Sequence, residues 1–255
     1  MTAAERNDQA ADNPSQHLLL QRRRWLDKPV VAELYRRQIY ARIAVARARA
    51  GPDVELGSGA SFYKRYAPAT FCSDLIPASW LDLACDAAEL PFADGSIGNL
   101  SGVDLLHHMA RPAGLFDQAC RVLKPAGRLI LVEPWMTPLG WLFYRLVHQE
   151  TCRFVGEPFD RQHGPARGAS PANPALPWLC LVGRARQFRR RWPGLAIRTI
   201  EPFCCWCWLL SGGLQPFSLL RAGWLPALLR AEERTRRLWS RWLSLRALIV
   251  IERCQ

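Results

Sequence analysis

The chain has 255 residues, of which 49% are hydrophobic and 22% charged, and its net charge is +12. This composition is typical of one large globular domain with a well-filled core, and it argues against a disordered or fibrous chain. The positive charge comes almost wholly from arginine, since the only lysines are Lys28, Lys64 and Lys124. Arginine-rich surfaces favour anionic partners such as phosphates, phospholipid surfaces or nucleic acid, but a GC-rich genome would explain the arginines equally well.

Residues 1–16 are polar and lack apolar periodicity, which predicts a disordered tail before a single domain at 17–255. From 17 to 50 the pattern becomes helical, because apolar residues recur at every fourth position. The residues of this stripe are Val31, Tyr35, Ile39 and Ile43.

A glycine turn follows at residues 54–61, which read Val-Glu-Leu-Gly-Ser-Gly-Ala-Ser. A short strand that ends in Gly57-x-Gly59 leaves bare backbone against which a nucleotide-like cofactor can lie. The dinucleotide fingerprint would require a third glycine where this chain has Phe62. The next apolar segment ends in Asp74, whose carboxylate could accept both hydrogen bonds from a ribose diol.

The rest of the chain alternates between strand-like and helix-like segments, as βαβ units do. The clearest helix runs from Pro112 to Leu123, opened by a proline and closed before a Lys-Pro-Ala-Gly turn. The continuous apolar run at 247–251 is typical of an inner strand. Strands are expected near 53–56, 70–74, 81–85, 99–104, 128–133, 195–200 and 245–251.

Three further segments follow the glycine turn in order. Residues 85–96 read Cys-Asp-Ala-Ala-Glu-Leu-Pro-Phe-Ala-Asp-Gly-Ser, and residues 103–109 read Val-Asp-Leu-Leu-His-His-Met. Residues 121–131 read Arg-Val-Leu-Lys-Pro-Ala-Gly-Arg-Leu-Ile-Leu. Together the four segments resemble class I S-adenosylmethionine (SAM) methyltransferases of the type 11 group, which includes quinone-biosynthesis methyltransferases. The resemblance is close over 54–133 and extends to the rest of the chain only in general plan.

The resemblance implies an α/β fold with a Rossmann-like, seven-stranded, mostly parallel sheet, flanking helices and an antiparallel last strand. It implies SAM as the cofactor, with the methionine end at the glycine turn, the ribose at Asp74 and the adenine at 86–87. It also implies that the helices of 17–50 fold over the cofactor as a lid, although they could simply pack on the sheet. The residues that it assigns to cofactor binding are Glu55, Gly57, Ser58, Gly59, Asp74, Asp86 and Ala87.

His107 and His108 fall at the end of the fourth expected strand, toward which the methyl group would point. Methyl transfer depends mainly on in-line positioning, but a hydroxyl acceptor would profit from a histidine acting as general base. The second histidine is also ordinary in the family, where it can simply pack below the site. Three further candidates lie in the first insertion described below, at His148, Glu150 and His163.

Two positions depart from the family pattern. Ser61 stands where the family usually has a third small glycine, and Gly98 stands where an aspartate is common. A glycine at a strand start weakens the strand. The departures leave open an alternative function, a degenerate SAM-binding module with a regulatory or scaffolding role.

Two insertions, 135–191 and 202–242, are expected to determine the substrate. The second is rich in tryptophan and leucine and is flanked by arginines. We interpret it first as an apolar cap over a substrate pocket and second as a peripheral contact with the inner face of the membrane. A membrane-spanning role is disfavoured because this stretch contains Gly212, Gly213 and Pro216.

The nine cysteines are scattered, and the polar N-terminus does not resemble a signal peptide. Buried thiols in a reducing cytoplasm are therefore expected. Cys204 and Cys207 form a Cys-x-x-Cys pair, but neither a second pair nor a nearby histidine completes a zinc site, so no metal is expected.

The preferred function is SAM-dependent methyl transfer to a small or lipid-linked metabolite by in-line displacement. A nucleic-acid-directed enzyme ranks last, because the arginines are spread along helices and no recognised RNA-binding module is present. The methyl acceptor and the oligomeric state stay open.

Overall fold

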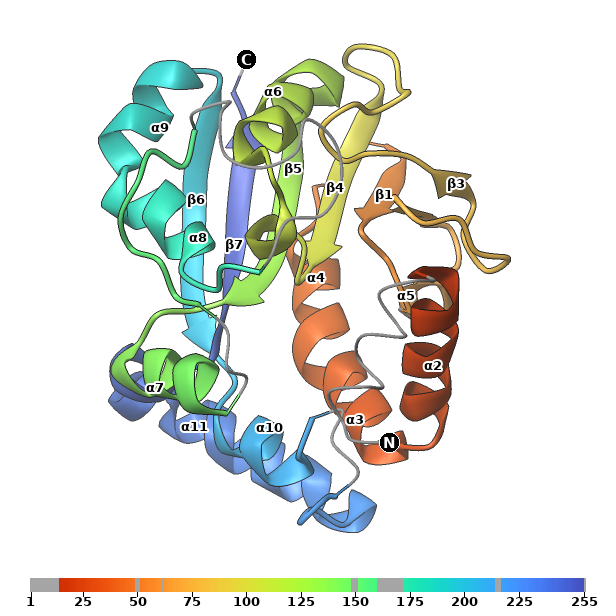
Figure 1. Cartoon of the computed structure of the whole chain (residues 1–255), viewed down its shortest axis with the longest axis vertical. Helices are drawn as coiled ribbons and strands as arrows, with labels where there is room; N and C mark the ends of the chain where they lie inside the picture. The colour runs from red at the N-terminus through yellow and green to blue at the C-terminus, as the bar shows by residue number, and fades with distance from the viewer. Residues whose placement is uncertain are drawn as a thin grey trace.

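A computed structural model of the chain describes residues 14–48, 51–60, 62–147, 151–159, 172–213 and 217–254. Its centre is a seven-stranded sheet with the strand order β3-β2-β1-β4-β5-β7-β6 (Figure 1). The pairs among β1 to β5 are parallel, and β7 pairs antiparallel with both β5 and β6. The predicted Rossmann-like sheet with an antiparallel last strand is thus confirmed. The strands are β1 (Asp53–Leu56), β2 (Phe71–Asp74), β3 (Leu83–Ala84), β4 (Ile97–Val103), β5 (Leu123–Pro134), β6 (Leu195–Phe203) and β7 (Arg246–Arg253).

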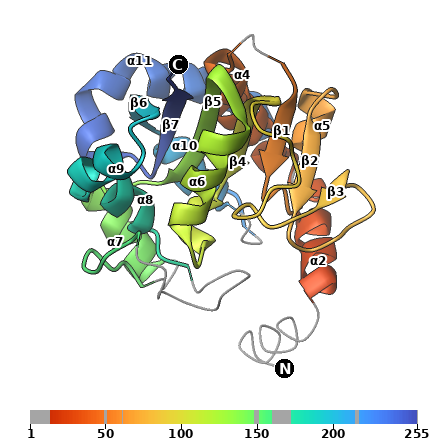
Figure 2. The same ribbon diagram turned by 90° about the horizontal axis from the view of Figure 1, so that it is seen from above.

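The central strands are apolar on both faces because helices cover both sides of the sheet. Alternate residues of β5 enter different cores: Leu129 and Leu131 pack on one side, Ile130 and Val132 on the other. Figure 2 shows α6 (Pro112–Val122) and α4 (Ala41–Ala46) on opposite sides of the sheet. The first core also receives α8 (Leu176–Trp178), the π-helical turn η3 (Leu179–Gly183) and α9 (Ala185–Arg191).

The N-terminal helices form part of the second layer. They are α2 (Pro14–Leu26), α3 (Pro29–Leu34), the π-helical turn η1 (Tyr35–Tyr40) and α4. The predicted apolar stripe is buried, with exposed fractions of 0% for Val31, Ile39 and Ile43 and 7% for Tyr35. The expected tail at 1–16 is wrong for its last three residues, because α2 begins at Pro14 with a helix-compatible proline. Residues 1–13 lie outside the described part of the chain.

The two insertions are mainly helical where they are described. The first contains α7 (Pro138–Leu146) and then α8, η3 and α9, while 148–150 and 160–171 lie outside the described residues. The second insertion follows β6 and contains α10 (Trp206–Ser211), the 3-10 turn η4 (Ala222–Trp224) and α11 (Leu225–Leu243). No described helix combines the length and the low charge that a membrane crossing demands.

Gly98 is buried inside β4, and its neighbours explain why a side chain is absent there. A Cβ at this position would lie 2.5 Å from the backbone nitrogen of Gly51 and 2.8 Å from its carbonyl carbon. The chain enters β1 directly across β4, where Gly98 N donates to Pro52 O at 2.9 Å. The strand also carries a register shift between Ile97 and Asn99. The aspartate common in the family would therefore not fit here.

The Cys-x-x-Cys pair is buried, as the absence of further metal ligands led us to expect. Cys204 and Cys207 are each 1% exposed, and every cysteine is free. Burial raises the pKa of the neighbouring Cys205 thiol to about 12, so this thiol stays protonated and unreactive at neutral pH.

Candidate functional site

The glycine turn lies at the carboxyl end of β1, as predicted. Gly57 and Gly59 have positive φ values of 62° and 49°, which is the conformation that glycine adopts without a steric cost. The turn is fastened to β2, because Ser58 N donates to Ser73 O and Gly59 N donates to Asp74 Oδ2, both at 2.8 Å. Ser61 lies outside the described residues. The sequence therefore places a bare, fixed backbone segment at the edge of the sheet.

Two of the predicted carboxylates lie beside this turn. Asp74 Oδ1 accepts a hydrogen bond from Ile76 N at 2.9 Å, and Asp86 Oδ1 accepts one from Ala88 N at 2.8 Å. A carboxylate can accept about four hydrogen bonds, so each retains acceptor capacity for a ligand. Both side chains line a cavity of about 180 Å³. Its other lining residues include Gly57, Leu75, Ala87, Asp104, His108 and Met109.

A second cavity, of about 340 Å³, adjoins the first. Gly57, Asp104 and His108 line both, so the two spaces meet at the carboxyl ends of β1 and β4. Glu55, Ser58 and Gly59 also reach the second cavity. Much of its wall is aromatic, and the aromatic residues are Trp25, Tyr35, Tyr40, Tyr144 and Trp208. These side chains come from α2, η1, α7 and α10, so the N-terminal helices and both insertions enclose the space.

His107 and His108 differ in their environment. His107 is 5% exposed, and its Nδ1 lies 2.8 Å from Oε2 of the fully buried Glu133. The other carboxylate oxygen of Glu133 accepts hydrogen bonds from the backbone N–H groups of Leu105 and Leu106, at 2.9 and 2.6 Å. A carboxylate that accepts from Nδ1–H leaves Nε2 as the basic nitrogen of the ring. His108 is exposed and lies against His107, with the ring centroids 4.1 Å apart and the two rings tilted by 41°.

The sequence did not draw attention to Glu133, although a signal was available. Glu133 is an acidic residue near the carboxyl end of a parallel strand, as Asp74 is. Asp74 was selected because ligands bind at the carboxyl ends of parallel strands, and the same reasoning would have selected Glu133.

Arg246 also lies at the candidate site, although the sequence did not point to it. Its Nη1 donates to both carboxylate oxygens of Asp104, at 2.7 and 2.8 Å, and its side chain is 6% exposed. Burial by itself would raise the pKa of Asp104, but the charge and hydrogen bonds of Arg246, together with the nearby His107 and His108, outweigh this effect and lower the pKa. The guanidinium also lies 4.7 Å from the ring centroid of Trp208. Its Nε is buried without a hydrogen-bond partner among the described residues, and Arg246 is one of the residues that line the aromatic cavity.

Asp104, His107 and Glu133 also offer ligand atoms that all lie within 4.8 Å of one another. The oxygens of Asp104 are engaged by Arg246, and those of Glu133 by two backbone N–H groups and His107. Each carboxylate thus has its own partners, and it is Glu133 that orients His107. Of the other candidate bases, His148, Glu150 and His163 lie outside the described residues.

Part of the chain is similar to known methyltransferases. A family model described as a methyltransferase domain matches residues 55–131. An uncharacterized methyltransferase of Mycolicibacterium vanbaalenii is 34% identical over 76 residues, which are 29% of this chain and 30% of that protein. The 27-O-demethylrifamycin SV methyltransferase of Amycolatopsis mediterranei is 42% identical over 53 residues, 21% of this chain and 20% of that protein. The chain thus spans less than a third of the length of these curated relatives.

Solved structures show the same fold over most of the chain. A SAM-dependent methyltransferase from Thermotoga maritima, described as a possible histamine N-methyltransferase, aligns with a TM-score of 0.51. The alignment covers 91% of this chain and 94% of that one at 13% identity. A SAM-dependent methyltransferase from Archaeoglobus fulgidus aligns with a TM-score of 0.50. This alignment covers 87% of this chain and 93% of that one at 13% identity. At this identity the likeness establishes the fold alone.

Proposed function

We propose that this chain, whose residues 55–131 match a methyltransferase domain, transfers the methyl group of SAM to a small or lipid-linked acceptor. The observation that carries the proposal is the meeting of two cavities at Gly57, Asp104 and His108. One cavity has the carboxylates suited to a nucleoside, and the other has the aromatic walls suited to an apolar acceptor.

In this proposal SAM occupies the smaller cavity and the junction. Its methionine end lies at Glu55, Gly57, Ser58 and Gly59, where positive φ values leave space against the backbone. Its ribose hydroxyls donate to the remaining acceptor positions of Asp74. Its adenine lies against Ala87, with the exocyclic amine donating to Asp86. The methyl group then points toward the aromatic cavity.

The chain's residues then have separate tasks in the reaction. The acceptor oxygen or nitrogen attacks the methyl carbon in line, the carbon–sulfur bond breaks, and sulfur keeps the electron pair. Nε2 of His107 takes the proton of the acceptor, while Glu133 holds the ring through Nδ1 and fixes its tautomer.

The degenerate-module alternative depended on Ser61 and Gly98. Close packing against Gly51 explains why a glycine stands at position 98. This departure from the family pattern is therefore no longer an argument for a degenerate cofactor site. Binding of SAM without turnover of any phenol or amine would favour the alternative.

Asp74→Ala should weaken SAM binding tenfold to about a hundredfold, because it removes charge-assisted hydrogen bonds worth about 1.5–3 kcal/mol. Calorimetric titration with SAM and S-adenosylhomocysteine measures the effect, with NADH as a ligand that should not bind. Asp94→Ala is the matched control, because Asp94 is 79% exposed and pairs with Arg121 at the surface. Equal affinities of wild type and Asp74→Ala would refute the assignment of Asp74.

A further inference from the structure

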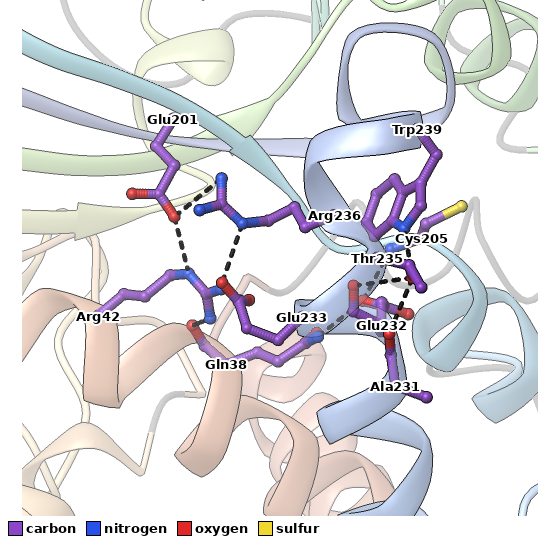
Figure 3. A network of polar contacts seen from close by, with 10 residues as sticks. All are labelled: Gln38, Arg42, Glu201, Cys205, Ala231, Glu232, Glu233, Thr235, Arg236 and Trp239. Atoms are coloured by element: carbon purple, nitrogen blue, oxygen red, sulfur yellow. Dashed lines mark hydrogen bonds and ion pairs between the residues drawn. The ribbon is translucent and has the colours of Figure 1, made fainter.

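The long helix α11 is fixed in its rotation by buried polar contacts on its inner face (Figure 3). Glu232 is 1% exposed and accepts hydrogen bonds from Gln38 Nε2 at 2.7 Å, Cys205 N at 3.2 Å and Cys207 N at 2.8 Å. Trp239 is also buried, and its Nε1 donates to Thr235. The opposite face of α11 must therefore point to solvent.

Ion pairs at the edge of α11 complete this attachment. Arg236 pairs with Glu201 at 3.3 Å and with Glu233 at 2.9 Å. Arg42 of α4 pairs with both of these carboxylates (Figure 3). The acidic residues of α11, Glu232 and Glu233, are thus engaged on its inner side and edge.

Four arginines form a ridge on the outer face. Their positions, i, i+4, i+7 and i+11, lie on one side of a helix, and all four side chains are exposed. Within the described part of the chain, no carboxylate forms an ion pair with any of them. The members of this arginine ridge are Arg230, Arg234, Arg237 and Arg241.

An exposed apolar row runs beside the arginine ridge. Its large members are Trp224, Leu238 and Trp242, which are 57%, 82% and 63% exposed. Spacings of three, four or seven residues place the row on one side of the helix, next to the ridge. Phe217 and Leu219, just before the helix, are exposed by 54% and 67%. The complete apolar row is Trp224, Ala227, Ala231, Leu238 and Trp242.

We propose that the outer face of α11 binds the surface of an anionic phospholipid bilayer. Arginines beside exposed tryptophan and leucine are the pattern of a helix that lies in the interface, with phosphates at the charged ridge and acyl chains at the apolar row. The helix is about 28 Å long at 1.5 Å per residue, so ridge and row form an extended contact. A nucleic acid would engage the arginines but would give Leu238 no partner. The proposal does not depend on methyl transfer.

Co-sedimentation of the full chain with lipid vesicles tests this surface. Wild type should bind vesicles of phosphatidylcholine mixed with phosphatidylglycerol and not vesicles of phosphatidylcholine alone. The variant Arg234→Gln/Arg237→Gln/Arg241→Gln should lose affinity by a factor of about ten to a hundred. The matched control, Arg186→Gln/Arg189→Gln/Arg190→Gln, removes the same charge from exposed positions of α9 and should bind like wild type.

A second variant tests the apolar row. Leu238→Ser/Trp242→Ser should weaken vesicle binding while leaving the thermal melting curve nearly unchanged, because both side chains are exposed. Equal losses in the α9 control and the ridge variant would overturn the proposal, because they would indicate a general charge effect. Unaltered vesicle binding by the ridge variant, with weakened binding of a single-stranded RNA oligonucleotide, would assign the face to nucleic acid instead.

Discussion

His107→Gln is expected to lower kcat by a factor of about 10² to 10⁴, the usual contribution of a positioned general base. Glutamine is similar in size and polar, but it cannot accept the proton of the methyl acceptor. SAM affinity should stay close to that of wild type, because the proposed cofactor contacts lie at other residues. Single-turnover transfer from radiolabelled SAM, to an acceptor found by screening phenols and amines, separates the two quantities.

Glu133→Gln provides a more specific test of the same arrangement. The amide oxygen could still accept from Leu105 and Leu106, but the amide nitrogen would donate to Nδ1 of His107. This reversal would put the ring proton on Nε2, and the nitrogen that faces the acceptor would no longer be basic. We therefore expect a loss of kcat similar to that of His107→Gln, without a loss of fold or of SAM binding.

His108 provides the comparison within the same segment. His108→Gln should lower kcat by less than about tenfold, because the exposed His108 ring is not the one held by Glu133. A His107→Gln enzyme that keeps kcat within about threefold would contradict the role of His107 and show that the acceptor needs no base.

Gly98→Ala should lower the free energy of unfolding by about 3 kcal/mol, a large effect for one methyl group. The added Cβ would press on the backbone of Gly51, which cannot rotate away as a flexible side chain could. The reduced entropy of the unfolded chain would offset only about 0.4–1 kcal/mol of this loss. Gly98→Asp should lower the free energy of unfolding further, because a buried carboxylate adds a desolvation cost. This holds although aspartate is common at this position in the family that the chain resembles.

Urea denaturation followed by circular dichroism measures this effect. Gly194→Ala is the matched control, because no atom lies within 4 Å of the Cβ position there. Equal stabilities of Gly98→Ala and Gly194→Ala would mean that the entry to β1 shifts easily and that Gly98 is not a packing requirement.

The strands were predictable because their apolar runs are dictated by burial on both faces. The prediction of 81–85 is too long, since β3 contains only Leu83 and Ala84, and that of 128–133 is too short, since β5 begins at Leu123. Just before β3, the carboxylate of Asp82 accepts the backbone N–H of Cys72 at 2.9 Å. No propensity scale contains such a side-chain contact.

Arg246 could not be found from its neighbours in the sequence. It begins β7, and its backbone pairs with Pro134 at the end of β5 and with Phe203 at the end of β6. Only an antiparallel strand brings its first residue to the edge where parallel strands end. Recognising Arg246 therefore requires the topology as well as the sequence.

The helices of the insertions escaped prediction for a related reason. The inner face of α11 is defined by Gln38, Cys205 and Cys207, which are far away in the chain or belong to another helix. The tryptophans alone did not distinguish a pocket cap from a surface row. In the structure the tryptophans divide between the two positions. Trp208 lines the aromatic cavity, whereas Trp224 and Trp242 are exposed at the surface.

The hydrogen bond between Gln38 and Glu232 limits how the molecule can open. Lifting η1 would leave a buried carboxylate with one donor fewer, which is costly in a low-dielectric interior. Lys28 is fastened as well, because its Nζ donates to the carbonyl groups of Ser211, Gly213 and Phe217. These contacts fasten η1 and the start of α3 to the second insertion, so Tyr35 and Trp208 form a fixed wall of the aromatic cavity.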